Sequence, residues 1–442
     1  MEIVADLHLH SKYSRAVSPS MTLPVMAAWA KKKGINLLTT SDFTHPLWFR
    51  EMRMLLEEEN EGIYKLKGAL QSDPSFLLSV EIASIYKQAD KLRRIHNLLF
   101  APSLEIAEKI NKELVRRGCN ISSDGRPIIG LSSRDLLEMA LSIDKQIILI
   151  PCHVWTPHFG LYGSASGFDT IEEAFGDLSK YIYGIETGIS SDPFMNWQIP
   201  ELDKRAILSF SDAHSAPKMG REATVFKLPK LSYLDFGKAL ARKSEDCKVS
   251  YTIEFYPEEG KYHFTGHRNC GVSLSPKDVK EKGAICPVCK RKLTEGVMFR
   301  VQQVAGHEVS TSEPTLQPDL NGVGWIKDPK NIHPPFVKLV PLLEVVAEGL
   351  FSTVASEKVK ALFDKMCQEL GSEIEILLRT SIEDIKKVAG ERIAHGVEKV
   401  RKGEIAIEPG FDGEYGKVKI WSEKASENNK VEEVKKEQLG FF

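Results

Sequence analysis

Short apolar runs alternate with helix-like stretches through the first 250 residues. Seven runs stand out: Ile3–Asp6, Asn36–Thr40, Leu77–Val80, Ile95–Phe100, Ile147–Ile150, Ile182–Ile185 and Ala206–Phe210. Two of the intervening stretches carry helix-end signals. Thr22 is suited to cap a helix that runs to Lys33, and Ser103 is suited to cap one that runs to Arg117. A glycine follows the last residue of each helix. Strands that alternate with helices predict an α/β fold with a parallel sheet or barrel over residues 1–250.

The pattern changes after residue 250. Residues 251–305 hold three cysteines but too little apolar material for a core of their own, and residues 306–335 are rich in Gly, Pro, Asn and Asp, as in a linker. Apolar residues recur at helical spacing within 336–421, which predicts a small helical domain. Residues 422–442 are charged and predict a flexible tail.

Composition narrows the class of protein. The 442 residues suffice for two or three domains, and 42% hydrophobic residues exclude a wholly disordered chain. No apolar run is long enough to cross a membrane, and the first residues do not resemble a signal peptide. Seven cysteines, an odd number, favour metal binding or burial over disulfides. We therefore expect a cytoplasmic protein with no membrane partner. The net charge of −2 argues against a nucleic-acid partner, unless charge is unevenly distributed.

Histidines and carboxylates gather at the ends of the predicted strands. The set comprises His8, His10, Asp42, His45, Glu81, His96, His153, Glu186, Asp212 and His214. In a parallel barrel the carboxyl ends of the strands meet on one face. Each residue alone has an ordinary explanation, such as a core histidine at His96 or a backbone-bonded carboxylate at Glu186. Their joint placement predicts instead a site for two or three divalent metals, with zinc, manganese, magnesium and iron as candidates.

Four of these residues are the predicted catalytic residues. They are His8, His10, Glu81 and Asp212, and we expect Asp212 to bridge metals and orient the attacking water.

The ordered motifs resemble those of the polymerase and histidinol phosphatase (PHP) superfamily. The matching stretches are His8-Leu9-His10-Ser11, Glu81, His96, His153 and Ser211-Asp212-Ala213-His214. The resemblance implies a distorted seven-stranded barrel, (β/α)7, that holds up to three metals and hydrolyses phosphoesters. Two positions depart from many members: Arg15 replaces an acidic residue, and Phe43 follows Asp42 where a histidine is usual. His45 could replace the missing ligand.

A second cluster indicates a structural zinc site. His267 and Cys270 form one close pair, Cys286 and Cys289 form another, and fifteen residues separate the pairs. His263 is an alternative fourth ligand. Residues 261–300 contain nine Lys or Arg and three acids, so this segment carries +6 within a nearly neutral chain. Such a segment suits a phosphate backbone, although lysines on a solvated zinc knuckle would look the same.

The order of barrel, zinc cluster and helical domain resembles the endonuclease Q family of archaea. Further matching stretches are Ser41–Pro46, Asp124–Pro127, Trp155–Pro157, Ser166–Asp169, Glu186–Gly188 and Ser190–Pro193. The resemblance implies cleavage of DNA on the 5′ side of deaminated bases (uracil, hypoxanthine, xanthine) and of abasic sites. Reading such a base requires flipping it out of the duplex. The loop Trp155–Asp169 is either part of that pocket or an ordinary barrel loop.

The last residues resemble, in degenerate form, a peptide that binds a sliding clamp. The residues concerned are Gln438, Leu439, Phe441 and Phe442, and packing onto the protein's own surface is the alternative. Two other functions also remain open for the whole chain. The barrel alone would permit a small-molecule phosphoesterase, and the zinc cluster would permit a non-enzymatic DNA-binding scaffold.

Overall fold

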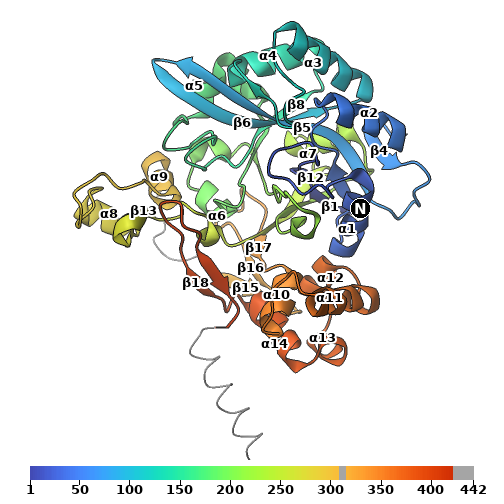
Figure 1. Cartoon of the computed structure of the whole chain (residues 1–442), viewed down its shortest axis with the longest axis vertical. Helices are drawn as coiled ribbons and strands as arrows, with labels where there is room; N and C mark the ends of the chain where they lie inside the picture. Colours follow the sequence, from blue (N-terminus) through green and yellow to red (C-terminus); the bar gives the residue numbers. More distant parts are fainter. Residues whose placement is uncertain (308–314, 422–442) are drawn as a thin grey trace, which may run out of the picture.

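The computed structural model describes residues 1–307 and 315–421. It has a large mixed sheet flanked by helices, a projecting segment that carries three of the seven cysteines, and a helical region near the carboxyl end (Figure 1). The predicted α/β class and the C-terminal helical region are thus confirmed.

The main sheet has thirteen strands among the described residues. They are β1 (Glu2–Asp6), β2 (Leu37–Thr39), β3 (Leu56–Asn60), β4 (Ile63–Leu66), β5 (Ser75–Gln88), β6 (Lys91–Ala101), β7 (Ile128–Ile129), β8 (Ile148–Pro151), β11 (Ala223–Lys227), β12 (Lys248–Glu254), β15 (Leu316–Pro318), β16 (Gly324–Ile326) and β17 (Phe336–Lys338). β1, β2 and β5 are parallel neighbours, and β11 pairs antiparallel with β1. A second sheet holds β9 (Gly184–Glu186) and β10 (Ala206–Leu208), which are parallel.

Every predicted run overlaps a strand, but the strands are not all parallel. β6 runs antiparallel to both β5 and β8. Ala89 and Asp90 join β5 to β6 with positive φ values of 49° and 58°, the backbone of a tight hairpin turn. The seven-stranded barrel stays a prediction, since β9 and β10 pair only with each other among the described strands. Beyond the strand ends, an isolated parallel bridge joins Leu9, which follows β1, to Ala213, which follows β10.

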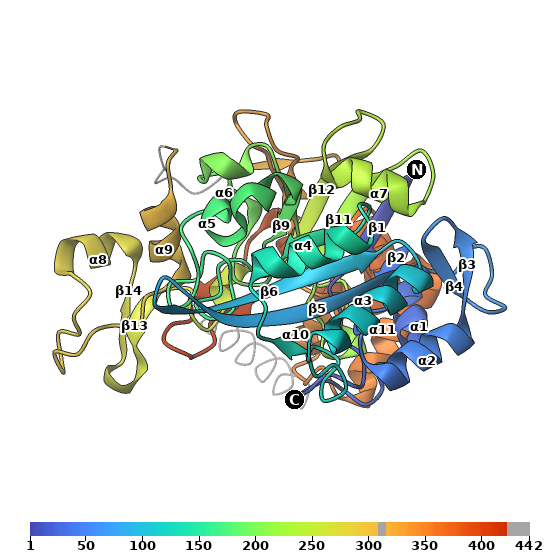
Figure 2. The ribbon, with the colours of Figure 1, turned by 90° about the horizontal axis from the view of Figure 1, so that it is seen from above.

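Helices cover the sheet of this N-terminal unit (residues 1–254). They are α1 (Leu23–Lys33), α2 (Pro46–Leu55), α3 (Leu104–Arg116), α4 (Ser133–Ile143), α5 (Ile171–Phe175), α6 (Pro193–Asn196) and α7 (Tyr233–Leu240), with 3-10 turns η1 (Gly176–Tyr181), η2 (Pro200–Leu202) and η3 (Ala216–Lys218). Figure 2 shows α3 and α4 over β5 and β6. Ser103 caps α3 as predicted by accepting the Ile106 N–H, whereas Thr22 makes no side-chain cap bond. Apolar spacing along α3 buries Ala107, Ile110 and Leu114 against the core.

The cysteine segment (residues 257–304) projects from the N-terminal unit (Figure 1). It contains η4 (Pro257–Glu259), β13 (Thr265–His267), η5 (Arg268–Cys270), β14 (Val272–Leu274), α8 (Pro276–Lys282) and α9 (Val297–Val304). The C-terminal helical unit contains α10 (Leu342–Gly349), α11 (Glu357–Leu370), α12 (Glu373–Leu378), α13 (Ile382–Ala389) and α14 (Glu391–Lys402). The chain then returns to the cysteine segment through the hairpin β18 (Ala406–Glu408) and β19 (Lys417–Lys419), where Phe264 N donates to Gly410 O at 2.9 Å.

Residues 306–335, which we expected to form a linker, contain two strands of the main sheet. β15 and β16 arise from residues 306–335, and β17 begins at Phe336, where a helical domain was expected. β17 pairs in parallel with β12, so the main sheet continues into the C-terminal part of the chain. Strands of three residues are too short to show alternation in the sequence.

Two predictions concern chain ends and membranes. The tail 422–442, with the clamp-peptide candidates Gln438, Leu439, Phe441 and Phe442, lies outside the described residues. Within residues 1–307 and 315–421, every helix is too short or too polar to cross a lipid bilayer.

Candidate active site

His8, His10 and Asp212 form the first ligand group of the site. The two histidines follow β1, and Asp212 follows β10. The bridge between Leu9 and Ala213 brings these two segments together. Asp212 Oδ1 lies 3.0 Å from His10 Nε2 and 3.6 Å from His8 Nε2. His214 also lies next to Asp212, with its Nδ1 3.7 Å from Asp212 Oδ1. Asp212 has φ of 46°, a conformation that Asp and Asn adopt more readily than most residues.

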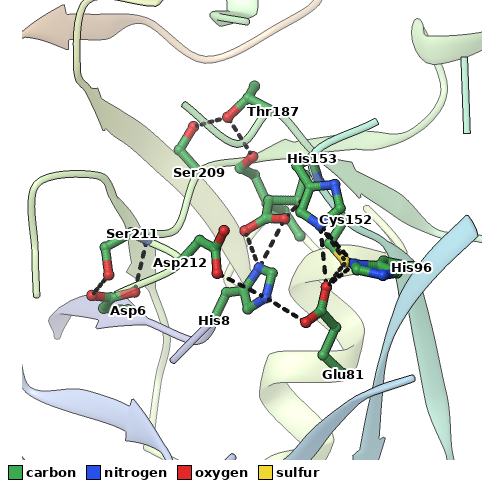
Figure 3. A network of polar contacts seen from close by, with 12 residues as sticks. Asp6, His8, Glu81, His96, Cys152, His153, Thr187, Ser209, Ser211 and Asp212 are labelled. Atoms are coloured by element: carbon green, nitrogen blue, oxygen red, sulfur yellow. Dashed lines mark hydrogen bonds and ion pairs between the residues drawn. The ribbon is translucent and has the colours of Figure 1, made fainter. Parts of the chain in front are cut away.

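Glu81, His96 and His153 form the second ligand group (Figure 3). Glu81 Oε1 faces His96 Nδ1 at 2.5 Å and His153 Nε2 at 3.1 Å. Its other oxygen faces the first group, 3.4 Å from His10 Nε2 and 3.8 Å from His8 Nε2. Glu81 therefore occupies the central place between the two groups that we had expected for Asp212.

Glu186 lies behind His8. Its two oxygens are 2.9 and 3.1 Å from His8 Nδ1, and Oε2 also accepts the backbone N–H of His153 at 2.8 Å. This arrangement makes Nδ1 the protonated nitrogen of His8 and leaves Nε2 free to bind a cation. The geometry thus favours an orienting role for Glu186 over the ligand role expected from the sequence. A side chain at Gly188 would collide with His153, which explains a glycine two residues after Glu186.

Asp42 and His45 lie to one side of these groups. Asp42 Oδ2 accepts hydrogen bonds from Ser11 N, Ser11 Oγ and Ser14 Oγ, and Oδ1 lies 3.6 Å from His10 Nδ1. His45 precedes α2 and stacks on Tyr13 with ring centroids 4.3 Å apart. Among the described residues, neither belongs to a compact group of three metal ligands. That His45 is a metal ligand stays a prediction.

The electrostatics of the site call for cations. Burial opposes charge on His10, but the hydrogen bond to Asp212 and the nearby carboxylates outweigh it and raise the pKa of His10 to about 9. Burial also opposes charge on Glu81, yet His96 and Arg126 hold the pKa of Glu81 well below its usual value. Three buried atoms of the site that could bind a metal have no hydrogen-bond partner: His8 Nε2, His10 Nδ1 and Asp42 Oδ1. Imidazole and carboxylate donors in this number fit divalent metals.

A cavity of about 750 Å³ opens onto these groups. His96, His153, Asp212 and His214 line it from the N-terminal unit, while the cysteine segment contributes Pro257, Glu259–His263 and Val297. Tyr415, in the turn between β18 and β19, also lines it.

Among the described residues, four cations line this cavity, and the sequence had singled out only Lys261, as part of the positive segment 261–300. They are Arg126, Lys218, Arg221 and Lys261. Arg126 Nη1 donates to Glu81 Oε2 at 3.1 Å, and the Lys261 ammonium lies 4.5 Å from the Tyr415 ring centre. No periodicity marks these residues, since they come from three separate segments of the chain: Arg126, the pair Lys218 and Arg221, and Lys261.

Part of the loop Trp155–Asp169 lines the cavity and part of it packs in the core, so its role in holding a base stays a prediction. Thr156, Pro157, His158 and Phe159 line the cavity. Two other aromatics of the loop are core residues: Trp155 and Tyr162 are fully buried and stack on each other.

The predicted zinc ligands come together at the far end of the cysteine segment. His267, Cys270, Cys286 and Cys289 bring their ligand atoms within 4.8 Å of one another. His267 Nδ1 lies 3.3 Å from Cys289 Sγ. Backbone N–H groups, chiefly that of Cys289, lower the pKa of Cys286 to about 6, which favours the thiolate that binds metal. His263 lies outside this group.

Comparison with known sequences gives three matches. Residues 341–404 match the family described as the MJ0043 C-terminal domain. The chain is 29% identical over 273 residues to the uncharacterized protein MJ0043 of Methanocaldococcus jannaschii, a match that covers 61% of this chain and 32% of that protein. It therefore spans about a third of that relative's length. It is 28% identical over 434 residues to the uncharacterized protein YqxK of Bacillus subtilis, covering 95% and 99% of the two chains.

Two solved structures match over nearly the whole chain. One is the lesion-specific endonuclease PfuEndoQ of Pyrococcus furiosus, with 31% identity, a TM-score of 0.79 and 96% of each chain covered. The other is endonuclease Q in complex with a 27-mer duplex that has an abasic lesion at its active site, with 31% identity, a TM-score of 0.79 and coverage of 96% and 98%. Because identity and fold are shared over almost the full length of both chains, the protein belongs to the endonuclease Q family.

Proposed function

We propose that the protein, a metal-dependent hydrolase, is a DNA endonuclease that hydrolyses the phosphodiester 5′ of a damaged base. The proposed lesions are deaminated bases (uracil, hypoxanthine and xanthine) and abasic sites. The observation that carries the proposal is the cavity, which joins two metal-ligand groups to a wall of cations from separate parts of the chain. The endonuclease Q complex with an abasic duplex supports the choice of duplex DNA as substrate.

The ligand groups fit the hydrolytic step. Divalent metals held there would supply a water nucleophile at neutral pH and offset the charge of the phosphate. Of the carboxylates Asp212, Glu81 and Glu186, Asp212 is the one that lines the cavity, and its side chain is 25% exposed, against 1% for Glu81 and 0% for Glu186. We therefore assign Asp212 to hold and orient the attacking water, and Glu81 to hold the two groups together.

The cations of the cavity fit the phosphate backbone. Arg126 is fixed to Glu81 on one side and faces the cavity, so it can bind a phosphate oxygen next to the ligand groups. Lys218, Arg221 and Lys261 extend the positive wall towards the cysteine segment. Zinc bound by His267, Cys270, Cys286 and Cys289 would fix the fold of that segment, which is too small for a core of its own.

Aromatic rings in the cavity fit an unstacked base. Phe159, Tyr262 and Tyr415 line it, and a flipped base is commonly held by aromatic or apolar side chains. A base with weakened pairing costs less to flip, which gives discrimination before any contact is made. The cavity wall formed by Pro257, Glu259–His263 and Tyr415 disfavours a small-molecule phosphatase, because a small substrate would not need this wall.

The test is cleavage of otherwise identical duplexes that carry uracil, hypoxanthine, xanthine, an abasic site or no lesion. We expect cutting 5′ of the lesion, loss of cutting with chelator, and no cutting by Asp212→Asn, which retains DNA binding. Asp90→Asn is the matched control, since Asp90 also has a positive φ but lies at the β5–β6 turn, outside the cavity. Equal cutting of undamaged DNA would contradict the lesion specificity, and turnover of phosphomonoesters alone would favour the phosphatase.

A further inference from the structure

Cys152 lies at the centre of the site, directly after β8. It is fully buried, and Figure 3 shows its sulfur beside Glu81, His96 and His153. The proposed reaction gives this thiol no role, and burial alone would account for a cysteine among apolar neighbours. Cys152 does pack within an apolar cluster, but its sulfur also faces ligand atoms of Glu81 and His153.

The distances around the sulfur match those between two ligands of one metal. Cys152 Sγ lies 3.6 Å from Glu81 Oε1 and 3.8 Å from His153 Nε2. Sulfur binds zinc at about 2.3 Å and nitrogen or oxygen binds it at about 2.0–2.2 Å, so two such ligands at a tetrahedral angle lie about 3.6 Å apart. The thiol can therefore bind a cation that Glu81 and His153 also bind, with no rearrangement of the backbone.

A second observation points to a ligand at the same place. His8 Nε2 is fully buried and has no hydrogen-bond partner, and it forms a compact ligand group with Glu81 and Cys152. Glu186 already holds the other nitrogen of His8, so Nε2 is the one presented to this group.

We propose that Cys152 is a thiolate ligand of the barrel metal centre, beside Glu81, and that it makes this position selective for a thiophilic divalent metal such as zinc. The inference rests on the proposed function, which places metals in these groups. On binding, the thiol S–H bond breaks, a metal–sulfur bond forms, and the proton leaves to solvent through the cavity. A ligand set of carboxylate and imidazole alone would also suit manganese or magnesium, whereas a thiolate favours zinc.

The test uses cobalt in place of zinc in the full-length protein. Cobalt bound to thiolate gives a near-ultraviolet charge-transfer band whose intensity follows the number of sulfur ligands. We compare the wild type with Cys152→Ser, and with Cys119→Ser as a control, since Cys119 lies in neither ligand cluster. The cysteine cluster contributes three thiolates in every protein, so the difference spectrum reports Cys152 alone.

We expect the intensity of four thiolates in the wild type and in Cys119→Ser, and of three in Cys152→Ser. We also expect zinc affinity in the barrel to fall at least about tenfold in Cys152→Ser, while manganese affinity stays unchanged. Equal bands, with cobalt bound in the barrel of all three proteins, would overturn the inference and leave the proposed function standing. Cobalt binding confined to the cysteine cluster would contradict both.

If Cys152→Ser does not fold, cadmium-113 NMR of the wild type gives the same answer. Each thiolate ligand moves the resonance downfield, so a barrel signal with a one-sulfur shift supports the inference. A barrel signal at the position of oxygen and nitrogen ligands alone overturns it.

Discussion

The substitution Glu186→Gln tests whether Glu186 orients His8 or binds a metal directly. Glu186 accepts two hydrogen bonds with its carboxylate, from His8 Nδ1 and from the backbone N–H of His153. A glutamine has only one acceptor oxygen, so its amide N–H₂ would face one of these two donors. His8 would then lose the partner that fixes its ring, or the His153 backbone would lose its acceptor.

The size of the effect follows from this geometry. Loss of a carboxylate behind a metal-binding histidine typically costs about 10–100-fold in metal affinity or activity, or about 1.4–2.7 kcal/mol. We expect a loss of this size for Glu186→Gln, with the full number of metals bound and much of the activity regained at high metal concentration. A direct ligand would behave differently, because its removal would leave one metal fewer at any concentration.

The assay combines metal titration with single-turnover cleavage of a lesion duplex at increasing metal concentration. Glu201→Gln is the matched control, since Glu201 also accepts a side-chain and a backbone hydrogen bond, from Tyr162 and Ile171, outside the ligand groups. A bound-metal count that falls by one in Glu186→Gln, with no recovery at high metal, would refute the orienting role.

Three further predictions follow from the cavity and the C-terminal unit. Arg126→Ala should lower kcat/KM by about 100-fold and flatten the salt dependence of DNA binding, with Arg134→Ala on the surface of α4 as control; an unchanged salt dependence would contradict its contact with phosphate. Cys286→Ser should lower the zinc content by one atom per chain and weaken DNA binding in a gel-shift assay, and full zinc content would show that it is no ligand. Arg401→Ala should destabilise the C-terminal helical unit by about 3 kcal/mol or more in urea unfolding, because the buried guanidinium donates to the Leu377, Ile376 and Asn321 carbonyls; a change below about 1 kcal/mol would contradict this.

Seven of the nineteen strands in the described residues could be predicted, because each of these buried runs is bounded by polar residues. The directions of the strands could not. A two-residue turn at Ala89 and Asp90 reverses the chain between β5 and β6, and neither residue is the glycine that usually signals such a turn. β15 and β16 were also missed, because three residues show no alternation.

The chemistry-bearing residues were partly predictable for a related reason. His8, His10, Glu81, His153 and Asp212 follow strands or lie within them, so a sheet that aligns the strands also aligns their side chains. The separate roles of these residues depend on distances between side chains that the spacing of residues along the sequence does not predict. Glu81 lies between the two ligand groups, and Glu186 orients His8. The cavity cations come from segments that are far apart in the sequence. Their meeting depends on how the cysteine segment packs against the N-terminal unit, which the sequence pattern does not reveal.

The central claim is that metals in the two ligand groups cut DNA only at a lesion. The most direct measurement is single-turnover cleavage of a duplex with one abasic site, beside its undamaged counterpart, by protein stripped of metal and then reloaded. The account predicts no cutting by the stripped protein, cutting 5′ of the lesion after reloading, and an intact undamaged duplex throughout. Cutting that survives removal of all metal, or equal cutting of both duplexes after reloading, would contradict it.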